Sequence, residues 1–152
     1  MPLTPLCVLR PALLQAVPSL EREGRGAVYI NGDVGGELSV DGSSTMSGNR
    51  ADGGAGGAIY IWNSVENITV DGNSTISANV AKWGGAIYIG YLVTTSLTVG
   101  GSSTISGNRA DGGNGGAVYV GANVGNLTID GSSTVSGNRA NGGDGETLAS
   151  VR

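Results

Sequence analysis

Hydrophobic and polar residues alternate in short runs that recur along the chain. The run GAVYI begins at Gly26, GAIYI begins at Gly57 and again at Gly85, and GAVYV begins at Gly116. A longer run follows each of them, and its first copy, LSVDGSSTMSGN, begins at Leu38. Alternation over short segments rich in Ile, Val, Thr and Tyr predicts β-strands with one buried face. We therefore expect about four copies of one repeat of roughly 30 residues.

The longer run keeps its internal spacing in every copy. Its two hydrophobic positions are eight residues apart, as in Leu38 and Met46. Three residues further on, every copy has an Asn: Asn49, Asn79, Asn108 and Asn138. Length varies only between the two runs and in the glycine-rich loop after the Asn. Fixed strands joined by variable loops are typical of stacked coils, because loops absorb insertions at small energetic cost.

These features predict an all-β fold, a right-handed parallel β-helix in which each repeat forms one coil of three short strands. The coils are expected at residues 26–56, 57–84, 85–115 and 116–145. A sandwich fits less well, because its strands meet different neighbours and therefore differ from one another. Stacked coils lie about 4.8 Å apart, so equivalent residues form continuous columns.

Within each strand, a period of two assigns alternate residues to the inside and the outside of the coil. The residues predicted to face inward in the second coil are Ile59, Ile61, Ile68, Val70 and Ile76. Their equivalents in the third coil are Ile87, Ile89, Leu97, Val99 and Ile105. The residues predicted to face outward are Ala58, Tyr60, Thr69 and Thr75. The repeated Asn residues are expected to form a structural ladder of side-chain amides at one corner.

The N-terminal segment, residues 1–25, falls outside the repeat. It is apolar but contains four Pro residues, with Arg10 in its middle, so it resembles a secretory signal only weakly. A short helix that starts after Pro11 is the better interpretation. Such a helix would cover the open end of the repeat core with one apolar face, made of Leu13, Leu14, Val17 and Leu20.

The C-terminal segment, residues 146–152, is expected to be a tail or a degenerate fifth coil, with Glu146 where the next GGAIYI run would begin. Both ends of such a repeat stack would leave strand edges unpaired. Unpaired edges invite association with another chain, so end-to-end self-association is expected.

Composition narrows the function. The 152 residues include 29 Gly and no His, and the net charge is −4. Binding of nucleic acid needs clustered Lys and Arg, which this chain lacks. Cys7 is the single Cys, so neither an internal disulfide nor a cysteine metal site is expected. No apolar run approaches the length of a membrane span, and no motif indicates a cofactor.

Repeated carboxylates are the first candidate chemistry. Asp41, Asp71 and Asp130 occupy equivalent positions, and Gly100 takes the place of the Asp in the third coil. Asp41 and Asp71 would lie near 5 Å apart, which makes them a weak candidate for a cation site. The simpler interpretation is that Asp-Gly is turn chemistry. Because an active site breaks repetition and these polar positions repeat, we expect no enzyme.

Repeated hydroxyl groups are the second candidate. A TxS column is made of Thr45, Ser47, Thr75, Ser77, Thr104, Ser106, Thr134 and Ser136. A regular array about 4.8 Å apart along the axis resembles the TxT faces of β-helical ice-binding proteins. The simpler interpretation is that Thr suits an exposed strand face and stacks well.

The two paired motifs resemble the repeats of chlamydial polymorphic outer membrane proteins, which have pectin-lyase-like β-helices. The family signatures are GGA[ILV] and FxxN. The first is present at 56–59, 84–87 and 115–118, and the second, with Phe replaced, ends at each repeated Asn. The resemblance implies a β-helix at the cell surface or outside the cell, often acting as an adhesin.

We therefore expect a non-catalytic extracellular or cell-surface repeat module, an adhesin-like scaffold that contacts a protein or glycan surface. One alternative is a fragment of a polysaccharide-active, pectin-lyase-like enzyme, whose fold is shared and whose chemistry needs clustered carboxylates. The other alternative is an ice-binding protein that uses the Thr and Ser columns.

Overall fold

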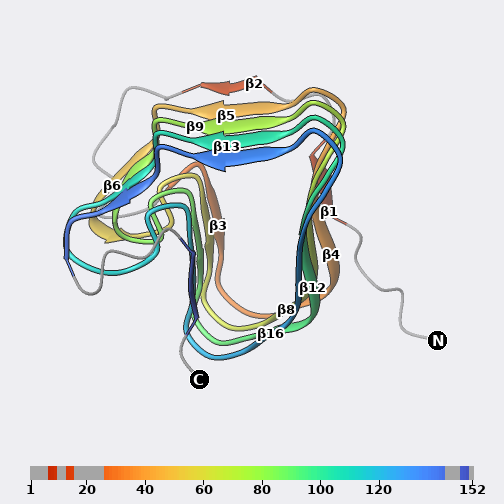
Figure 1. Ribbon diagram of the computed structural model, residues 1–152. Helices are drawn as coiled ribbons and strands as arrows, with labels where there is room; N and C mark the ends of the chain where they lie inside the picture. Colours follow the sequence, from red (N-terminus) through yellow and green to blue (C-terminus); the bar gives the residue numbers. More distant parts are fainter. Residues whose placement is uncertain (1–6, 10–12, 16–25, 143–147, 151–152) are drawn as a thin grey trace.

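The structure of the chain is a computed structural model that describes residues 7–9, 13–15, 26–142 and 148–150. All regular elements in this part of the chain are β-strands. Figure 1 looks along the axis of a solenoid, in which successive repeats form coils that lie one behind another. The coils wind in the right-handed sense, as parallel strands joined by crossovers almost always do. The all-β parallel β-helix predicted from the repeat is confirmed.

Equivalent strands of successive coils pair in four parallel sheets, which we call sheets A to D. Sheet A, on the right of Figure 1, contains β1 (Cys7–Leu9), β4 (Val34–Val40), β8 (Val65–Val70), β12 (Val93–Val99) and β16 (Val124–Ile129). Sheet B, at the top, contains β2 (Leu13–Gln15), β5 (Thr45–Ser47), β9 (Thr75–Ser77), β13 (Thr104–Ser106) and β17 (Thr134–Ser136).

The other two sheets close the coil on the left of Figure 1. Sheet C contains β6 (Arg50–Ala55), β10 (Val80–Trp83), β14 (Arg109–Ala110) and β18 (Arg139–Ala140). Sheet D contains β3 (Val28–Ile30), β7 (Ile59–Ile61), β11 (Ile87–Ile89), β15 (Val118–Val120) and β19 (Leu148–Ser150). Each full coil therefore runs through the sheets in the order D, A, B and C.

The prediction of three strands in each coil was wrong, because sheet C adds a fourth. Its strands lie in the loop after the repeated Asn, where Gly, Asp and Ala give little preference for a β-strand. The pairing comes from the backbone of the neighbouring coil: the N–H of Val80 donates to the oxygen of Asn49 at 2.9 Å. A loop that stacks on an equivalent loop thus becomes a strand without the composition of one.

The predicted N-terminal helix was also wrong for the residues that the structure describes. Leu13 and Leu14 belong to β2, which pairs in parallel with β5 and places Leu14 beside Met46. The edge of sheet B offers these residues backbone partners for a strand, whereas an isolated short helix is only marginally stable in water. Val17 and Leu20 lie outside the described residues. Among the described residues, no helix is long and apolar enough to cross a membrane.

The C-terminal segment contributes one more strand. β19 pairs with β15 and places Leu148 beside Val118, so sheet D extends into a partial fifth coil. Glu146, the predicted start of that coil, lies outside the described residues.

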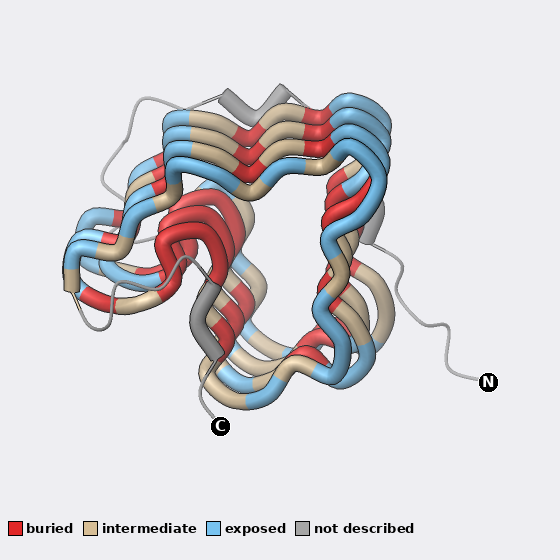
Figure 2. The backbone as a smooth tube through the Cα atoms, in the orientation of Figure 1, coloured by how far each residue is buried: buried red, intermediate tan, exposed pale blue. Residues whose placement is uncertain are grey.

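The core is a set of aliphatic columns inside the coil. All ten residues predicted to face inward in the second and third coils are buried. Tyr60, Thr69 and Thr75, which were predicted to face outward, are half-buried. The prediction that Ala58 faces outward was wrong, because this residue is fully buried in the core cluster. It precedes the first residue of β7, at the turn from sheet C to sheet D that Figure 2 shows as buried, so strand alternation does not reach it.

Glycine is required where the chain enters sheet D. Gly56 has a φ of 66°, in the left-handed region that favours Gly. A Cβ atom on Gly57 would lie 2.1 Å from the backbone oxygen of Gly85, closer than any real contact. The repeated GGA motif therefore lets neighbouring coils approach at this turn.

Candidate functional site: repeated surface columns

The repeated Asn side chains form one hydrogen-bonded column where sheet B leads into sheet C. Nδ2 of Asn49 donates to Oδ1 of Asn79 at 2.8 Å. The same bond joins Asn79 to Asn108 at 2.9 Å and Asn108 to Asn138 at 2.8 Å. The backbone N–H of each donor residue also reaches that Oδ1, at 3.0 Å. These side chains are satisfied inside the protein, so the column sets the register of the coils and is not a surface for a ligand.

A second polar column, which sequence reasoning missed, lies where sheet A leads into sheet B and is buried in the first three coils. It contains Ser44, Ser74, Ser103 and Ser133. The backbone N–H of Ser44 donates to Oγ of Ser74 at 3.2 Å, and that of Ser74 donates to Oγ of Ser103 at 3.2 Å. The signal was present in the SST and NST triplets, but Ser is common in turns and such a position seemed ordinary.

The predicted hydroxyl face is the outer side of sheet B. The pairing places Thr45 beside Thr75 and Thr75 beside Thr104, and the column ends at Thr134. The Ser residues of the TxS motif form a parallel column, in which Ser77 lies beside Ser106. These side chains are half-buried in the first three coils and exposed in the fourth. On the N-terminal side the array stops, because β2 places Leu13 and Gln15 beside Thr45 and Ser47.

An aromatic column lies on the outer side of sheet D. The rings of Tyr29 and Tyr60 stack with centroids 4.9 Å apart, and those of Tyr60 and Tyr88 with centroids 5.2 Å apart. Tyr119 continues the stack at 5.1 Å from Tyr88, with the ring planes within 8° of each other. Burial and the neighbouring Tyr119 raise the pKa of the Tyr88 hydroxyl, so it stays neutral and can donate a hydrogen bond.

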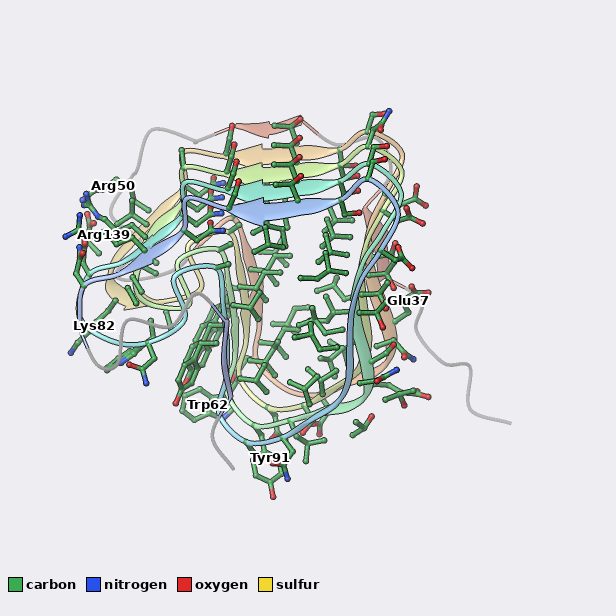
Figure 3. The ribbon with its side chains drawn as sticks, viewed as in Figure 1. Glu37, Arg50, Trp62, Lys82, Tyr91 and Arg139 are labelled. Atoms are coloured by element: carbon green, nitrogen blue, oxygen red, sulfur yellow. The ribbon has the colours of Figure 1, made fainter. Side chains whose placement is uncertain are left out.

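Exposed aromatic residues extend this column toward sheet A. Trp62 is 60% exposed, and its ring lies 6.4 Å from that of Tyr60 in a tilted arrangement. Tyr91 is 54% exposed. Figure 3 shows Trp62 beside the stacked rings and Tyr91 at the lower edge of the solenoid. The sequence indicated a Tyr in every GA[IV]Y[IV] run, but treating it only as an outward residue missed the ring stack.

Charged residues gather on sheet C. Figure 3 shows Arg50, Lys82 and Arg139 projecting from this side. Arg109 donates to Oδ2 of Asp111 at 2.8 Å, and the Arg50 guanidinium pairs with Asp52 in the same way. Burial alone would raise the pKa of Asp111, but hydrogen bonds from Arg109 and Asn141 outweigh it and lower that pKa.

The second coil replaces the Arg–Asp pair on sheet C. There Nζ of Lys82 lies 4.4 Å from the ring centroid of Trp83. This cation–π contact takes the place that an ion pair has in the coils on either side. Sheet C is thus the face on which the coils differ from one another.

The repeated Asp residues lie just after the strands of sheet A. Oδ1 of Asp71 accepts a hydrogen bond from the N–H of Gly72 at 2.7 Å, as expected for a turn residue. A Cβ on Gly100 would lie 3.4 Å from Oδ1 of Asp71 and 3.0 Å from Oδ1 of Asp130, so these carboxylates approach each other across the missing side chain. Asp41 is half-buried and lies beside Gly72.

These Asp residues stay a weak candidate for a cation site. Within the described ranges, no group of three or more His, Cys, Asp or Glu side chains could hold a metal ion. The chemistry that the described surface offers consists of hydroxyl groups and aromatic rings that repeat from coil to coil, together with charges on sheet C that vary between coils.

This arrangement defines the class: a parallel β-solenoid whose outer side chains form columns. The family model of the Chlamydia polymorphic membrane protein repeat matches residues 43–61, 67–90 and 102–121. Each matched segment includes a TxS strand, the Asn that follows it and the next GGA[IV] run. Over these three segments the chain is therefore similar to the Chlamydia polymorphic membrane protein repeat. No curated protein and no solved structure shows significant similarity to it.

Proposed function

We propose that this chain is a non-catalytic, adhesin-like module that acts at the cell surface or outside the cell and binds a protein or glycan through its surface columns. The observation that carries the proposal is the register of the outward residues: Tyr60 lies beside Tyr88, and Thr75 beside Thr104. The repeat type supports the location, because it is named for a membrane protein of Chlamydia.

Repeated columns suit the binding of an extended partner. Each coil presents the same group about 4.8 Å from the last, so a partner with its own repeated groups makes several equal contacts. Contacts that are weak alone add up when they are held on one rigid support. Tyr and Trp supply large, partly apolar surfaces with a polar end, which are common at interfaces.

Binding is tested with the full chain against an array of neutral and acidic glycans and against purified extracellular matrix proteins. Tyr60→Ser with Tyr88→Ser alters the aromatic column, and Thr75→Lys with Thr104→Lys alters the hydroxyl face. We expect one pair to weaken binding by about tenfold or more and the other to leave it within about twofold. Absence of binding to every probe, or equal loss from both pairs, would contradict a localised surface.

The non-catalytic part of the proposal is tested separately. Polysaccharide lyases and hydrolases place a unique set of carboxylates at one site, whereas Asp41, Asp71 and Asp130 repeat with the coils. Incubation with polygalacturonate and other acidic glycans, with and without calcium, is expected to give no unsaturated or shortened products. Turnover that Asp71→Asn removes would establish the enzyme alternative.

Ice binding is a second candidate, which the unbroken register of the Thr and Ser columns on sheet B favours. Thermal hysteresis of the purified chain is the direct measurement. If ice is the ligand, Thr75→Tyr with Thr104→Tyr abolishes the hysteresis, because the larger rings interrupt the array. The matched control is Thr69→Tyr with Thr98→Tyr on sheet A, which leaves it unchanged. A chain without hysteresis excludes this candidate.

A further inference from the structure

The two ends of the solenoid extend different sheets. Sheets A and B begin with β1 and β2, which precede the first full coil, whereas sheet D begins with β3 of that coil. At the other end, sheet D continues to β19, while sheets A and B end at β16 and β17. In the part of the chain that the structure describes, each of the three sheets contains five strands, but sheet D is displaced by one coil along the axis.

The C-terminal end exposes apolar residues of sheets A and B. Leu127 is 47% exposed and Ile129 is 45% exposed, whereas the equivalent Leu97 and Val99 are buried at 2% and 1%. Val135 in sheet B is half-buried, although Ile105 beside it is fully buried. Figure 2 shows this change as a front coil that is pale blue and tan where the coils behind it are red.

The N-terminal end shows the opposite pattern. Leu38 and Val40 are fully buried where β1 borders β4. In sheet D, Val28 and Ile30 of β3 are only half-buried, because β3 is the edge strand of that sheet. Apolar positions are therefore open in sheet D at one end, and in sheets A and B at the other.

We propose that copies of this chain associate head to tail through these displaced ends. The edge strands β16 and β17 of one copy pair with β1 and β2 of the next, and β19 of the first pairs with β3 of the next. The junction is then a complete run of sheets D, A and B, with one strand from the first copy and two from the second. Every apolar edge position named above gains a neighbouring strand.

The register of the proposed junction follows from the register within the chain. Cys7 lies beside Leu38, and Leu38 stacks through the coils onto Leu127. In the junction, Cys7 of the next copy therefore lies beside Leu127. The strands on the two sides differ from each other, so each junction leaves both outer ends open, and the assembly grows as a filament.

Disulfide trapping tests this register with the native Cys7 as the probe. In the junction, Leu127→Cys of one copy would place its new Cys beside Cys7 of the next copy. The two strands lie about 4.8 Å apart, within the Cα separation that a disulfide spans. Under mild oxidation we expect a ladder of linked oligomers on a non-reducing gel. Ile129→Cys is the matched control, because it lies two residues further along the strand, and we expect no ladder. A ladder from Ile129→Cys, or none from Leu127→Cys, would overturn the proposal.

Sedimentation of the chain as it stands provides the second test. The mean mass is expected to rise with concentration above the 15.0 kDa of one chain. Leu127→Lys with Ile129→Lys should keep the chain monomeric, whereas the neighbouring Thr128→Lys, which faces outward, should assemble like the wild type. A wild-type chain that stays monomeric at all concentrations, or equal assembly of all three chains, would overturn the proposal.

Mixing two blocked variants distinguishes this geometry from other contacts. Val28→Lys blocks the N-terminal end, and the Leu127 and Ile129 double variant blocks the C-terminal end. After circular dichroism has shown that both retain their strands, each alone should be monomeric. The mixture should form dimers and nothing larger, because it offers one intact pair of ends. Dimers of either variant alone, or no dimers in the mixture, would overturn head-to-tail association.

Discussion

Sheets B and C lie on either side of the Asn column, but they change differently along the solenoid. Every full coil has a three-residue strand in sheet B, and the register is unbroken from β5 to β17. The strands of sheet C shorten from six residues in β6 to two in β14 and β18. In the second coil, the register of sheet C also shifts between Ala81 and Trp83.

This difference shows which side of the coil determines the spacing and register of successive coils. Sheet B is bordered by the Ser and Asn columns, whose side chains bond from one coil to the next. Sheet C buries only small residues, such as Ala51 and Ala81, and exposes charges. We infer that sheet B sets the spacing of the coils, whereas sheet C tolerates changes in length and carries residues that distinguish one coil from another.

Removal of one Asn should have the largest effect on stability. Asn79→Ala deletes the acceptor of Nδ2 of Asn49 and the donors to Met46 and Asn108, all in the interior. Leaving several buried polar groups unpaired should lower the free energy of unfolding by about 4–6 kcal/mol. Urea denaturation followed by circular dichroism measures this change.

The matched control for this variant is Asn123→Ala, at an exposed position. Its side chain makes no contact that the register of the coils requires, so the expected change is within about 0.5 kcal/mol. Equal losses from the two variants would show that the Asn column does not specify the stack.

Truncation of a core side chain should have the next largest effect on stability, and the effect should be larger in sheet B than in sheet C. Ile76→Ala in sheet B leaves a cavity in a fully buried column and should cost about 2–5 kcal/mol. Ala81→Gly in sheet C removes one buried methyl group and should cost about 1 kcal/mol. The same urea measurement compares them, and a larger loss from Ala81→Gly would reverse the comparison.

Insertions should show the difference between sheets B and C in their tolerance of added residues. Two Gly residues added after Gly53, whose surroundings are open, lengthen the loop of sheet C and should cost less than about 1 kcal/mol. The same insertion after Gly48 separates β5 from Asn49. We expect this variant to lose the cooperative thermal unfolding transition that the wild-type chain shows. Thermal unfolding of the two variants distinguishes a tolerant loop from a fixed one.

The ion pairs of sheet C should give the smallest effect. The lowered pKa of Asp111 means that the pair stabilises the fold fully above the ordinary carboxyl pKa of about 3.9, and that this gain is lost as pH falls from there through the lowered pKa of the folded chain. Because the pair is on the surface, the gain should be well under 1 kcal/mol. Arg109→Gln should remove the difference in stability between pH 6 and pH 3 that this pair contributes.

Much of sheet B was predictable because its spacing never changes. The step from Leu38 to Met46 and then to Asn49 recurs in all copies, so the inward residues and the Asn positions follow from periodicity. Stacking of equal residues then places the hydroxyl face on the opposite side of the same strands. The periodicity of the sequence predicts the structure where stacked side chains, such as the buried aliphatic and Asn columns, hold the coils together.

Sheet C and the N-terminal strands were not predictable in the same way. The run RADGGA has the composition of a loop, and it becomes β6 because the coil beside it supplies backbone partners. Leu13 and Leu14 fit a helix in isolation, but the edge of sheet B takes them as a strand. Ala58 is buried by the turn between two sheets, a feature of the coil and not of its local sequence.

The account depends on one central claim, that residues about one repeat apart are direct neighbours in space. Nuclear Overhauser contacts in the labelled chain measure this directly. We expect contacts between the side-chain amides of Asn79 and Asn108 and between the backbone protons of Ile76 and Ile105, in the pattern of parallel strands. Contacts in an antiparallel pattern, or none between these pairs, would contradict the parallel stack of coils.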